Sequence, residues 1–302
     1  MGYKINGGEI GIFGDETYLV LTQFQADRNL KIDGKCTADT WRHLTEATWK
    51  LGDRLLYLRK PMLRGDDVAK LQITLSNLGF SSGKIDGIFG PQTLEAVVDF
   101  QQNQHINNDG IVGPNTLRAL NRVSRPDTSQ VTCIDNLKEF IEFKSKIRSI
   151  PNFKIGIGDM GGSDVLVHLL NKKLGAFNLN TDVLMGLNER GIVTQANNSN
   201  YDLCIFFQYD ELIYSFNVYH YKGFSYESMP GLGLGNLIAE KLSALNLCTE
   251  SGNSLGCSFP ILRETRMPTL LIELGTPIIK PANSYLIVDS VFSAIAEYIS
   301  AK

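Results

Sequence analysis

The stretch RETRMPTLLIELGTP, residues 263–277, carries Glu273 within an apolar segment. Thr269–Ile272 is short, apolar and partly β-branched, and a proline stands on either side of the segment, which predicts a buried strand that ends near Glu273. Ligand sites of open α/β sheets form at the carboxyl ends of their strands, and a half-buried carboxylate there can transfer protons. Glu273 is therefore a candidate catalytic residue. The alternative is a structural glutamate that pairs with Arg263 or Arg266.

The composition is that of a globular protein. The chain has 302 residues, 43% hydrophobic and 20% charged, which is enough for two or three compact units. The net charge of −3 argues against nucleic acid as a partner. Five cysteines without close pairing predict neither a disulfide framework nor a cysteine zinc site, and they fit a reducing compartment. The sequence shows no apolar run of about 18 residues and no apolar leader, so we expect no transmembrane segment and a cytoplasmic protein.

The N-terminal part of the chain contains an internal repeat. Ile12-Phe13-Gly14 recurs as Ile88-Phe89-Gly90, and the further landmarks keep the same spacing (88 − 12 = 76). The landmarks of the first copy are Phe13, Gly14, Thr17, Phe24, Gln25, Asp33 and Gly34. Those of the second copy are Phe89, Gly90, Thr93, Phe100, Gln101, Asp109 and Gly110, preceded by Asp86 and Gly87. Landmarks that stay in register without a gap indicate a duplicated unit.

Each copy predicts short helices joined by glycine turns. Asp-Gly and Phe-Gly are turn signals, and we expect Thr17 and Thr93, which follow the two Phe-Gly pairs, to be helix N-caps. In the second copy Val68, Leu71 and Leu75 are spaced for a further amphipathic helix. The unit is therefore a small all-α domain of about three helices, with little room for a catalytic cavity.

The second copy, over residues 64–123, resembles the peptidoglycan-binding domain often found beside bacterial cell-wall hydrolases. The resemblance rests on RGDDVAKLQ at residues 64–72 and on DGIFGPQT at residues 86–93. It implies that the landmark residues of both copies form binding motifs for peptidoglycan. The alternative is that the repeats are helical packing units that bind nothing.

The first copy is incomplete. The counterpart of Asp66 would fall before the first residue (66 − 76 = −10), and Ile10 stands where the second copy has Asp86. Either this copy is degenerate or the chain lacks residues that its natural form has, such as a signal peptide or a regulatory tail. We therefore expect an N-terminally incomplete repeat over residues 1–50 and a second repeat over residues 62–123.

The remainder of the chain predicts a linker and a larger domain. Ser124–Gln130 is polar and contains a proline, so residues 124–150 are expected to be a linker with a connecting helix. Strand and helix patterns alternate over residues 151–302, which predicts a three-layer α/β domain. The expected strands are residues 153–157, 203–207, 215–219 and 269–274, and the expected helices are residues 165–174, 234–245 and 285–300. The expected fold class is multidomain: small all-α repeats followed by a three-layer α/β domain.

The α/β domain resembles the zinc-dependent N-acetylmuramoyl-L-alanine amidases. KIGIGDMGG at residues 154–162, YDLCIFFQ at residues 201–208 and TRMPTLLIELG at residues 265–275 follow the motif order of that family. The resemblance implies that Glu273 is a retained catalytic position. It also implies that the two zinc-binding histidines of the family correspond to Met160 and Gln208.

These two departures argue against zinc. A catalytic zinc takes histidine nitrogens and carboxylates, whereas the thioether of Met160 suits copper(I) and the amide of Gln208 is a poor ligand. No glutamate occurs between Met160 and Glu189 to complete the set, and His168 and His220 stand outside the motif positions. We therefore expect no metal and no cofactor, and without a metal Glu273 has no Lewis acid to polarise an amide.

Three functions remain open. Repeats of this type joined to an altered amidase domain resemble the amidase-fold regulators of actinobacteria. That resemblance implies a catalytically inactive cytoplasmic protein that regulates peptidoglycan precursor synthesis by binding UDP-N-acetylglucosamine enolpyruvyl transferase, under Ser/Thr phosphorylation control. Peptidoglycan fragments or a lipid-linked precursor are further expected partners. The alternative is an active zinc-dependent amidase that cleaves the muramoyl–L-alanine amide with other ligands. A plain wall-binding protein, the third interpretation, would need no retained Glu273.

Overall fold

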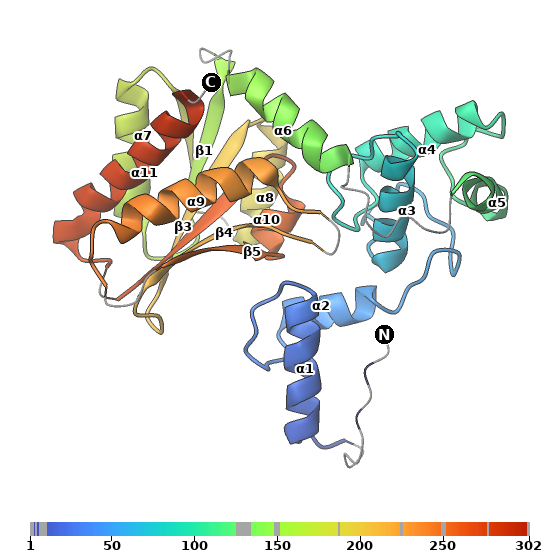
Figure 1. Ribbon diagram of the computed structural model, residues 1–302, viewed down its shortest axis with the longest axis horizontal. Helices are drawn as coiled ribbons and strands as arrows, with labels where there is room; N and C mark the ends of the chain where they lie inside the picture. Colours follow the sequence, from blue (N-terminus) through green and yellow to red (C-terminus); the bar gives the residue numbers. More distant parts are fainter. Residues whose placement is uncertain are drawn as a thin grey trace. The chain divides into compact units, whose positions relative to one another are not determined.

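The computed structural model describes Tyr3, Ile5 and residues 11–124, 134–147, 152–186, 188–223, 226–248, 252–276 and 278–300 (Figure 1). The chain divides into two compact units, Met1–Lys138 with Gly223–Tyr226, and Glu139–Lys222 with Glu227–Lys302. We call them the repeat unit and the α/β unit. Their boundary falls within α6 (Ile134–Ile147), and residues 125–133 and 148–150 of the expected linker and connecting helix lie outside the described residues.

The sequence repeat is also a structural repeat. Its described helices are α1 (Asp15–Asp27), α2 (Ala38–Glu46), α3 (Asp66–Asn77), α4 (Pro91–Asn103) and α5 (Pro114–Val123). Helices α1 and α4 begin and end at the same spacing (91 − 15 = 76; 103 − 27 = 76). Gly14 and Gly90 occupy their N-cap positions, so the expectation that Thr17 and Thr93 cap these helices is wrong. The extended glycine already ends the turn, and Pro91 then supplies the preset backbone angle of a first helical residue.

The second repeat has a closed apolar core. Its buried members are Leu56, Leu63, Val68, Leu71, Leu75, Phe89, Ala96, Val97, Phe100, Val112, Ala119 and Leu120. Phe80 adds an edge-to-face contact to Phe100, with ring centroids 5.5 Å apart. Because α3 contributes Val68, Leu71 and Leu75, this helix covers the apolar face of α4.

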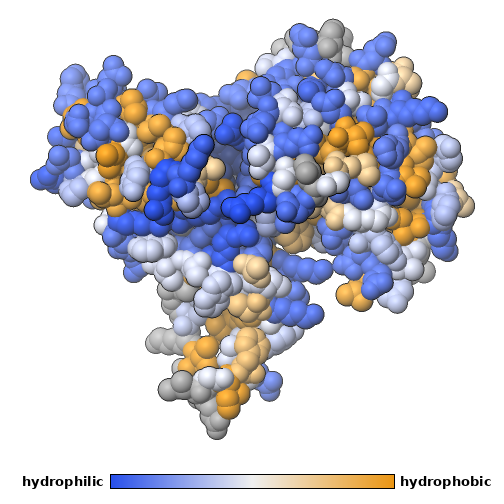
Figure 2. All heavy atoms as spheres, turned by 180° about the vertical axis from the view of Figure 1, so that it is seen from behind, coloured by the Kyte–Doolittle hydropathy of each residue, from blue (hydrophilic) through white to orange (hydrophobic). Residues whose placement is uncertain are grey.

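The first repeat buries much less apolar surface. Helix α1 buries Leu21 and Phe24, but Phe13 is exposed although its counterpart Phe89 lies in the core of the second repeat. Figure 2 shows apolar residues gathered on the surface of this repeat, at the bottom of the view. The cause is that α3 has no counterpart among the residues that the structure describes in the first repeat.

The α/β unit is built on one sheet of six strands in the order β2-β1-β3-β6-β4-β5. The strands are β1 (Lys154–Asp159), β2 (Asn180–Leu184), β3 (Leu203–Asp210), β4 (Phe216–Tyr221), β5 (Asn253–Cys257) and β6 (Thr269–Gly275). β4 and β6 are antiparallel, and the other neighbouring pairs are parallel. The sheet is therefore mixed, with β1, β3 and β6 at its centre.

Helices cover both faces of this sheet. α7 (Asp164–Ala176), α9 (Met229–Ser243) and α11 (Ser284–Ser300, after the short η2, Pro281–Asn283) lie together on one face (Figure 1). They pack on the strand residues that point to that face, such as Ile157, Phe207 and Ile272. α8 (Glu189–Asn198) and α10 (Pro260–Glu264) contact each other and the strands from the opposite side. The predicted fold class, all-α repeats followed by a three-layer α/β domain, is confirmed. None of the helices that the structure describes has the length and apolar character needed to cross a bilayer.

Candidate functional site

The three positions that the sequence singled out in the α/β domain lie side by side. Gln208 of β3 pairs with Glu273 of β6, and Glu273 pairs in turn with Asn217 of β4. Met160 follows directly after β1, and its N–H donates to the Phe207 carbonyl at 2.8 Å, which sets it beside Gln208. Paired residues of neighbouring strands point to the same side of a sheet. Gln208, Glu273 and Asn217 therefore form one row across β3, β6 and β4, and Met160 lies next to the Gln208 end of this row. These four residues are here called the edge row.

Glu273 is the buried centre of this row. Its side chain is only 5% exposed. The Tyr219 hydroxyl donates to Glu273 Oε2 at 3.0 Å, and the Asn217 amide donates to the same oxygen at 3.3 Å. Burial, and next the neighbouring Glu273 carboxylate, raise the pKa of the Tyr219 hydroxyl well above its usual value. Tyr219 thus stays protonated and remains a donor, and one carboxylate oxygen is held within the sheet.

The turn after β1 fixes the position of Met160. Asp159 Oδ1 accepts hydrogen bonds from the N–H groups of Gly161 and Ser163, both at 3.0 Å. The Tyr209 N–H donates to the Gly161 carbonyl at 2.9 Å and ties the turn to β3. Gly161 has a φ of 143°, a backbone angle that a residue with a side chain rarely adopts. The glycine turn therefore holds Met160 next to the end of β3.

The edge row does not fit zinc. Its side chains are a thioether, two amides and a carboxylate, whereas zinc sites use imidazole, thiolate and carboxylate. Asp159 Oδ1, in the turn beside Met160, accepts two backbone hydrogen bonds. Within the described ranges, no group of three or more His, Cys, Asp and Glu side chains could hold a metal ion. The residues present therefore do not provide the ligand set on which the amidase resemblance depends.

The histidines of the α/β unit lie away from Glu273. His168 is exposed on α7. His220 is on β4, but alternation along the strand points it to the face opposite Asn217 and Tyr219. It is 1% exposed, and its Nε2 lies 2.9 Å from Glu227 Oε1. Burial lowers the pKa of His220, although the Glu227 carboxylate opposes this effect. Neither histidine can replace the ligands that Met160 and Gln208 do not supply.

The motif residues of the second repeat surround a buried glutamine. Gln101 Nε2 donates to Asp109 Oδ1 (3.1 Å), to the Ile111 carbonyl (3.0 Å) and to Thr116 Oγ1 (3.0 Å). Its Oε1 accepts from the Gly110 N–H at 2.8 Å. Each polar atom of this side chain is thus used to fold the Asp-Gly turn onto the end of α4.

The same arrangement, here called the glutamine clamp, occurs twice more. Gln25 binds Asp33 Oδ1 (2.9 Å), Thr40 Oγ1 (3.3 Å) and the Gly34 N–H (2.9 Å) in the first repeat. In the second repeat Gln72 of α3 clamps an earlier turn. It binds Asp86 Oδ1 (3.1 Å), Thr93 Oγ1 (3.1 Å) and the Gly87 N–H (2.9 Å).

Asp109, the aspartate partner of Gln101, is held in its charged form. Backbone hydrogen bonds, above all the one donated by the Ile111 N–H, hold the pKa of Asp109 below its usual value.

Most of the predicted binding residues therefore have a structural role. Gln25, Gln101 and their aspartate and glycine partners order the turns, while Phe24, Phe89 and Phe100 fill the cores. Phe13 alone among the predicted aromatic residues is well exposed. Binding of peptidoglycan by these residues stays a prediction.

The sequence pattern did not predict Gln72, Asn217 or Tyr219 as site residues. Gln72 was visible at the end of the RGDDVAKLQ stretch. Asn217 and Tyr219 alternate with apolar Phe216 and Val218, which is a detectable sign of a strand with one polar face. The partner of that polar face could not be read from the pattern, because it comes from a segment more than fifty residues away (273 − 219 = 54).

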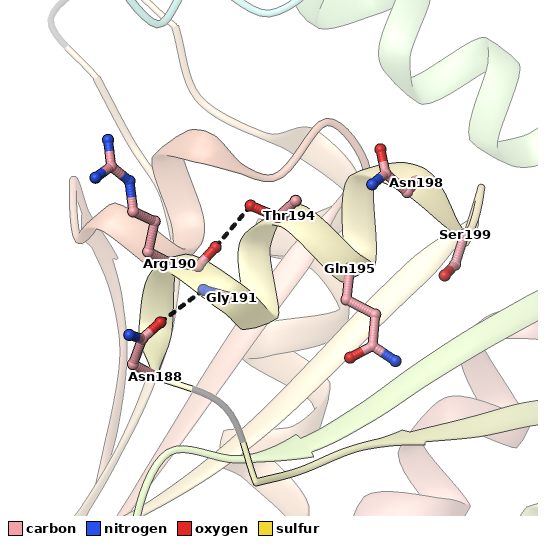
Figure 3. A pocket seen from close by; sticks show the side chains of 7 residues that line it. All are labelled: Asn188, Arg190, Gly191, Thr194, Gln195, Asn198 and Ser199. Carbon is pink, nitrogen blue, oxygen red and sulfur yellow. Dashed lines mark hydrogen bonds between the residues drawn. The ribbon is translucent and has the colours of Figure 1, made fainter. Parts of the chain in front are cut away.

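A surface hollow of about 620 Å³ lies along α8 and does not include the edge row. It is lined by Asn188, Arg190, Gly191, Thr194, Gln195, Asn198 and Ser199 (Figure 3). All seven belong to one helix and its two caps. Asn188 Oδ1 accepts from the Gly191 N–H at 2.9 Å, and Thr194 Oγ1 donates to the Arg190 carbonyl at 2.8 Å. One helix surface encloses no ligand, so this hollow is not a candidate active site.

Parts of the chain are similar to known proteins. Residues 1–44 and 64–120 match the family described as "Putative peptidoglycan binding domain". The N-acetylmuramoyl-L-alanine amidase CwlM of Mycobacterium tuberculosis is 47% identical over 98 residues, which are 32% of this chain and 24% of that protein. A probable N-acetylmuramoyl-L-alanine amidase of Bacillus licheniformis is 32% identical over 124 residues, which are 36% of this chain and 35% of that protein. The crystal structure of the amidase Ami1 from Mycobacterium smegmatis covers 51% of this chain and 99% of its own, with a TM-score of 0.44 and 12% identity.

The predicted resemblances are thereby confirmed. Both repeats are similar to the peptidoglycan-binding domain family, and the chain resembles proteins named as N-acetylmuramoyl-L-alanine amidases, CwlM among them. The chain spans about a quarter of the length of the first relative and about a third of the second.

Proposed function

We propose that this chain is a catalytically inactive amidase-fold protein that regulates peptidoglycan precursor synthesis by binding a cytoplasmic enzyme, with UDP-N-acetylglucosamine enolpyruvyl transferase as the first candidate partner. The observation that carries the proposal is the edge row. At the two positions where the amidase resemblance calls for histidine, Met160 and Gln208 stand beside Glu273. This donor set does not suit zinc, and without a metal Glu273 lacks the Lewis acid that would polarise the amide in the chemistry of the zinc amidases.

The surroundings of Glu273 support a structural use of this residue. Its carboxylate accepts from Tyr219 and Asn217 of the neighbouring strand, so it links β6 to β4. A buried hydrogen-bonding group that loses its partner lowers the stability of the fold. This cost is a physical reason for Glu273 to be retained without a catalytic role. The fold would then serve recognition: the α/β unit would bind a partner enzyme, and the repeats would bind peptidoglycan fragments or a lipid-linked precursor.

Zinc binding is the first test. The full chain is stripped with a chelator and titrated with zinc in a calorimeter, beside the Met160→His/Gln208→His variant and the His168→Ala variant. We expect no stoichiometric zinc heat from the wild type. Zinc bound one to one at sub-micromolar affinity, and kept by His168→Ala, would overturn the proposal. Digestion of purified sacculi would then test the amidase alternative.

The regulatory role needs a separate measurement. Purified UDP-N-acetylglucosamine enolpyruvyl transferase is assayed by phosphate release with and without a molar excess of the chain. We expect the rate to change and the two proteins to co-elute in gel filtration. An unchanged rate without co-elution would refute this choice of partner, whatever the zinc titration shows.

A further inference from the structure

Six consecutive exposed residues lie between two anchors of the second repeat's core. Residues 57–62, YLRKPM, are all exposed, whereas Leu56 and Leu63 on either side are buried in that core. Leu56 and Val112 exchange two backbone hydrogen bonds of 2.8 and 3.3 Å, and the Leu63 carbonyl accepts from the Phe89 N–H at 2.9 Å. The core therefore fixes both ends of this segment, here called the Tyr57 loop, and leaves its six side chains at the surface.

The Tyr57 loop is largely apolar. Tyr57, Leu58 and Met62 are 39%, 38% and 41% exposed. The backbone bridge next to the loop is antiparallel and sets Tyr57 opposite Ile111, which is itself 38% exposed. Apolar side chains from two segments of the chain thus adjoin at the surface, as they do at interaction sites of soluble proteins.

Two cations lie among these apolar residues. Arg59 and Lys60 are exposed and make no hydrogen bond, ion pair or ring contact with any residue that the structure describes. Arg54, by contrast, pairs with Asp67 at 2.7 Å. No acidic residue occurs over residues 54–64, although the whole chain has a net charge of −3. The positive charge is therefore a local property of the Tyr57 loop.

We propose that the Tyr57 loop binds the surface of a membrane that contains anionic lipids. Segments that lie on a bilayer combine apolar side chains, which enter the boundary between headgroups and acyl chains, with lysine and arginine, which attract anionic headgroups. Tyrosine is enriched at the same depth. Arg59 and Lys60 contact lipid phosphates in this arrangement, while Leu58 and Met62 enter the apolar layer. With two cations and a few apolar side chains, the binding is weak and reversible.

An acidic protein surface fits the Tyr57 loop less well. Such a surface could pair with the two cations, but it would also need an apolar pocket shaped to the loop. The apolar layer of a bilayer accepts exposed side chains in any arrangement. The proposal concerns the repeat unit alone and does not depend on the function proposed for the α/β unit.

Co-sedimentation of the full chain with lipid vesicles tests the proposal. Vesicles of equal parts phosphatidylcholine and phosphatidylglycerol are compared with vesicles of phosphatidylcholine alone. We expect the chain to sediment with the anionic vesicles and much less with the neutral ones. Added salt should weaken the binding, because it screens the attraction between the cations and the lipid phosphates.

One pair of variants tests the charge. Arg59→Gln/Lys60→Gln should lower the partition coefficient onto anionic vesicles roughly 30-fold, since it removes two basic residues from the membrane surface. Lys70→Gln/Arg122→Gln is the matched control. It removes the same charge from exposed positions that have no exposed apolar residue beside them in the sequence, and it should bind as the wild type does.

A second pair of variants tests the apolar side chains. Tyr57→Ser/Met62→Ser keeps the charge and should weaken binding to anionic vesicles roughly 10-fold. Its control is Tyr214→Ser/Met229→Ser, which changes an exposed tyrosine and an exposed methionine of the α/β unit and should leave binding unchanged. The changed positions are all exposed, and equal melting temperatures by circular dichroism will show that the variants are folded.

Three results would refute the proposal. The first is no binding of the wild type to anionic vesicles, which would favour an acidic protein surface as the occupant of the loop. The second is equal weakening by the two charge variants, because binding would then follow the charge of the whole chain. The third is unchanged binding of Tyr57→Ser/Met62→Ser, because the loop would then not enter the apolar layer.

Discussion

The glutamine clamp of the second repeat allows a direct test of whether the motif residues serve stability. Replacing Gln101 by methionine keeps the length and burial of the side chain but removes its hydrogen bonds to Asp109, Ile111, Thr116 and Gly110. Each neutral hydrogen bond contributes about 0.5–1.5 kcal/mol, and a buried partner left unsatisfied costs about 1–3 kcal/mol. Since part of the turn will rehydrate, we expect the free energy of unfolding of the repeat unit to fall by about 2–4 kcal/mol.

Tryptophan fluorescence during urea unfolding measures this loss. The two tryptophans of the chain, Trp41 and Trp49, are both in the repeat unit, so the signal reports on that unit. With a urea dependence of about 2 kcal/mol per molar, the midpoint should fall by about 1–2 M. The control is Gln102→Met at the next, exposed position, which should change stability by less than about 0.5 kcal/mol.

The opposite result would refute the reasoning. If Gln101→Met unfolds at the same urea concentration as the control but no longer binds peptidoglycan fragments, the glutamine serves a ligand and not the turn. If both stability and binding fall, the loss of binding follows from the disordered turn.

Two further predictions concern the α/β unit. Burial lowers the pKa of His220 in the folded state, so the unfolded chain binds more protons as the pH falls. The contribution of His220 to the stability of the fold is therefore complete above about pH 6.5 and declines below that pH. Calorimetry between pH 7.5 and 5 should show a melting temperature for this unit that falls less steeply in His220→Phe, and an unchanged slope would contradict the assignment. Tyr219→Phe removes a donor to the Glu273 carboxylate and should destabilise the unit by about 1.5–3 kcal/mol. Loss of the exposed hydroxyl in Tyr214→Phe should have no comparable effect, and equal melting temperatures for these two variants would show that the Glu273 contact contributes little.

The elements that the sequence predicted are those with a strong local pattern. The central strands β1, β3 and β6 are apolar runs, and α7, α9 and α11 carry long apolar stripes. The sequence pattern did not predict β2, β5, α8 and α10. β2 and β5 are the edge strands of the sheet, NTDVL and NSLGC, which are short and half polar because each has only one neighbour. The five residues of α10 are too few to show a helical period.

The repeat could be detected from the sequence for a similar reason. Its landmarks are glycines and short polar residues at tight turns, and turn geometry restricts such residues wherever the turn recurs. The assignment of Thr17 and Thr93 as N-caps failed because Gly14 and Gly90 already occupy those positions. The hydroxyl of Thr93 is used instead by Gln72, and that contact joins two helices.

The sequence by itself determined the duplicated helical unit, the alternation of strands and helices, and the position of Glu273 in the C-terminal half of a strand, because each depends on periodicity and turns over a few residues. Only the tertiary structure decided that the four residues of the edge row lie together and that Tyr219 and Asn217 donate hydrogen bonds to the Glu273 carboxylate. It also decided that His220 points to the opposite face of the sheet from Glu273. Strand order and register are set by the packing of segments far apart in the chain, and a shift of one residue would turn each of these side chains to the other face of the sheet.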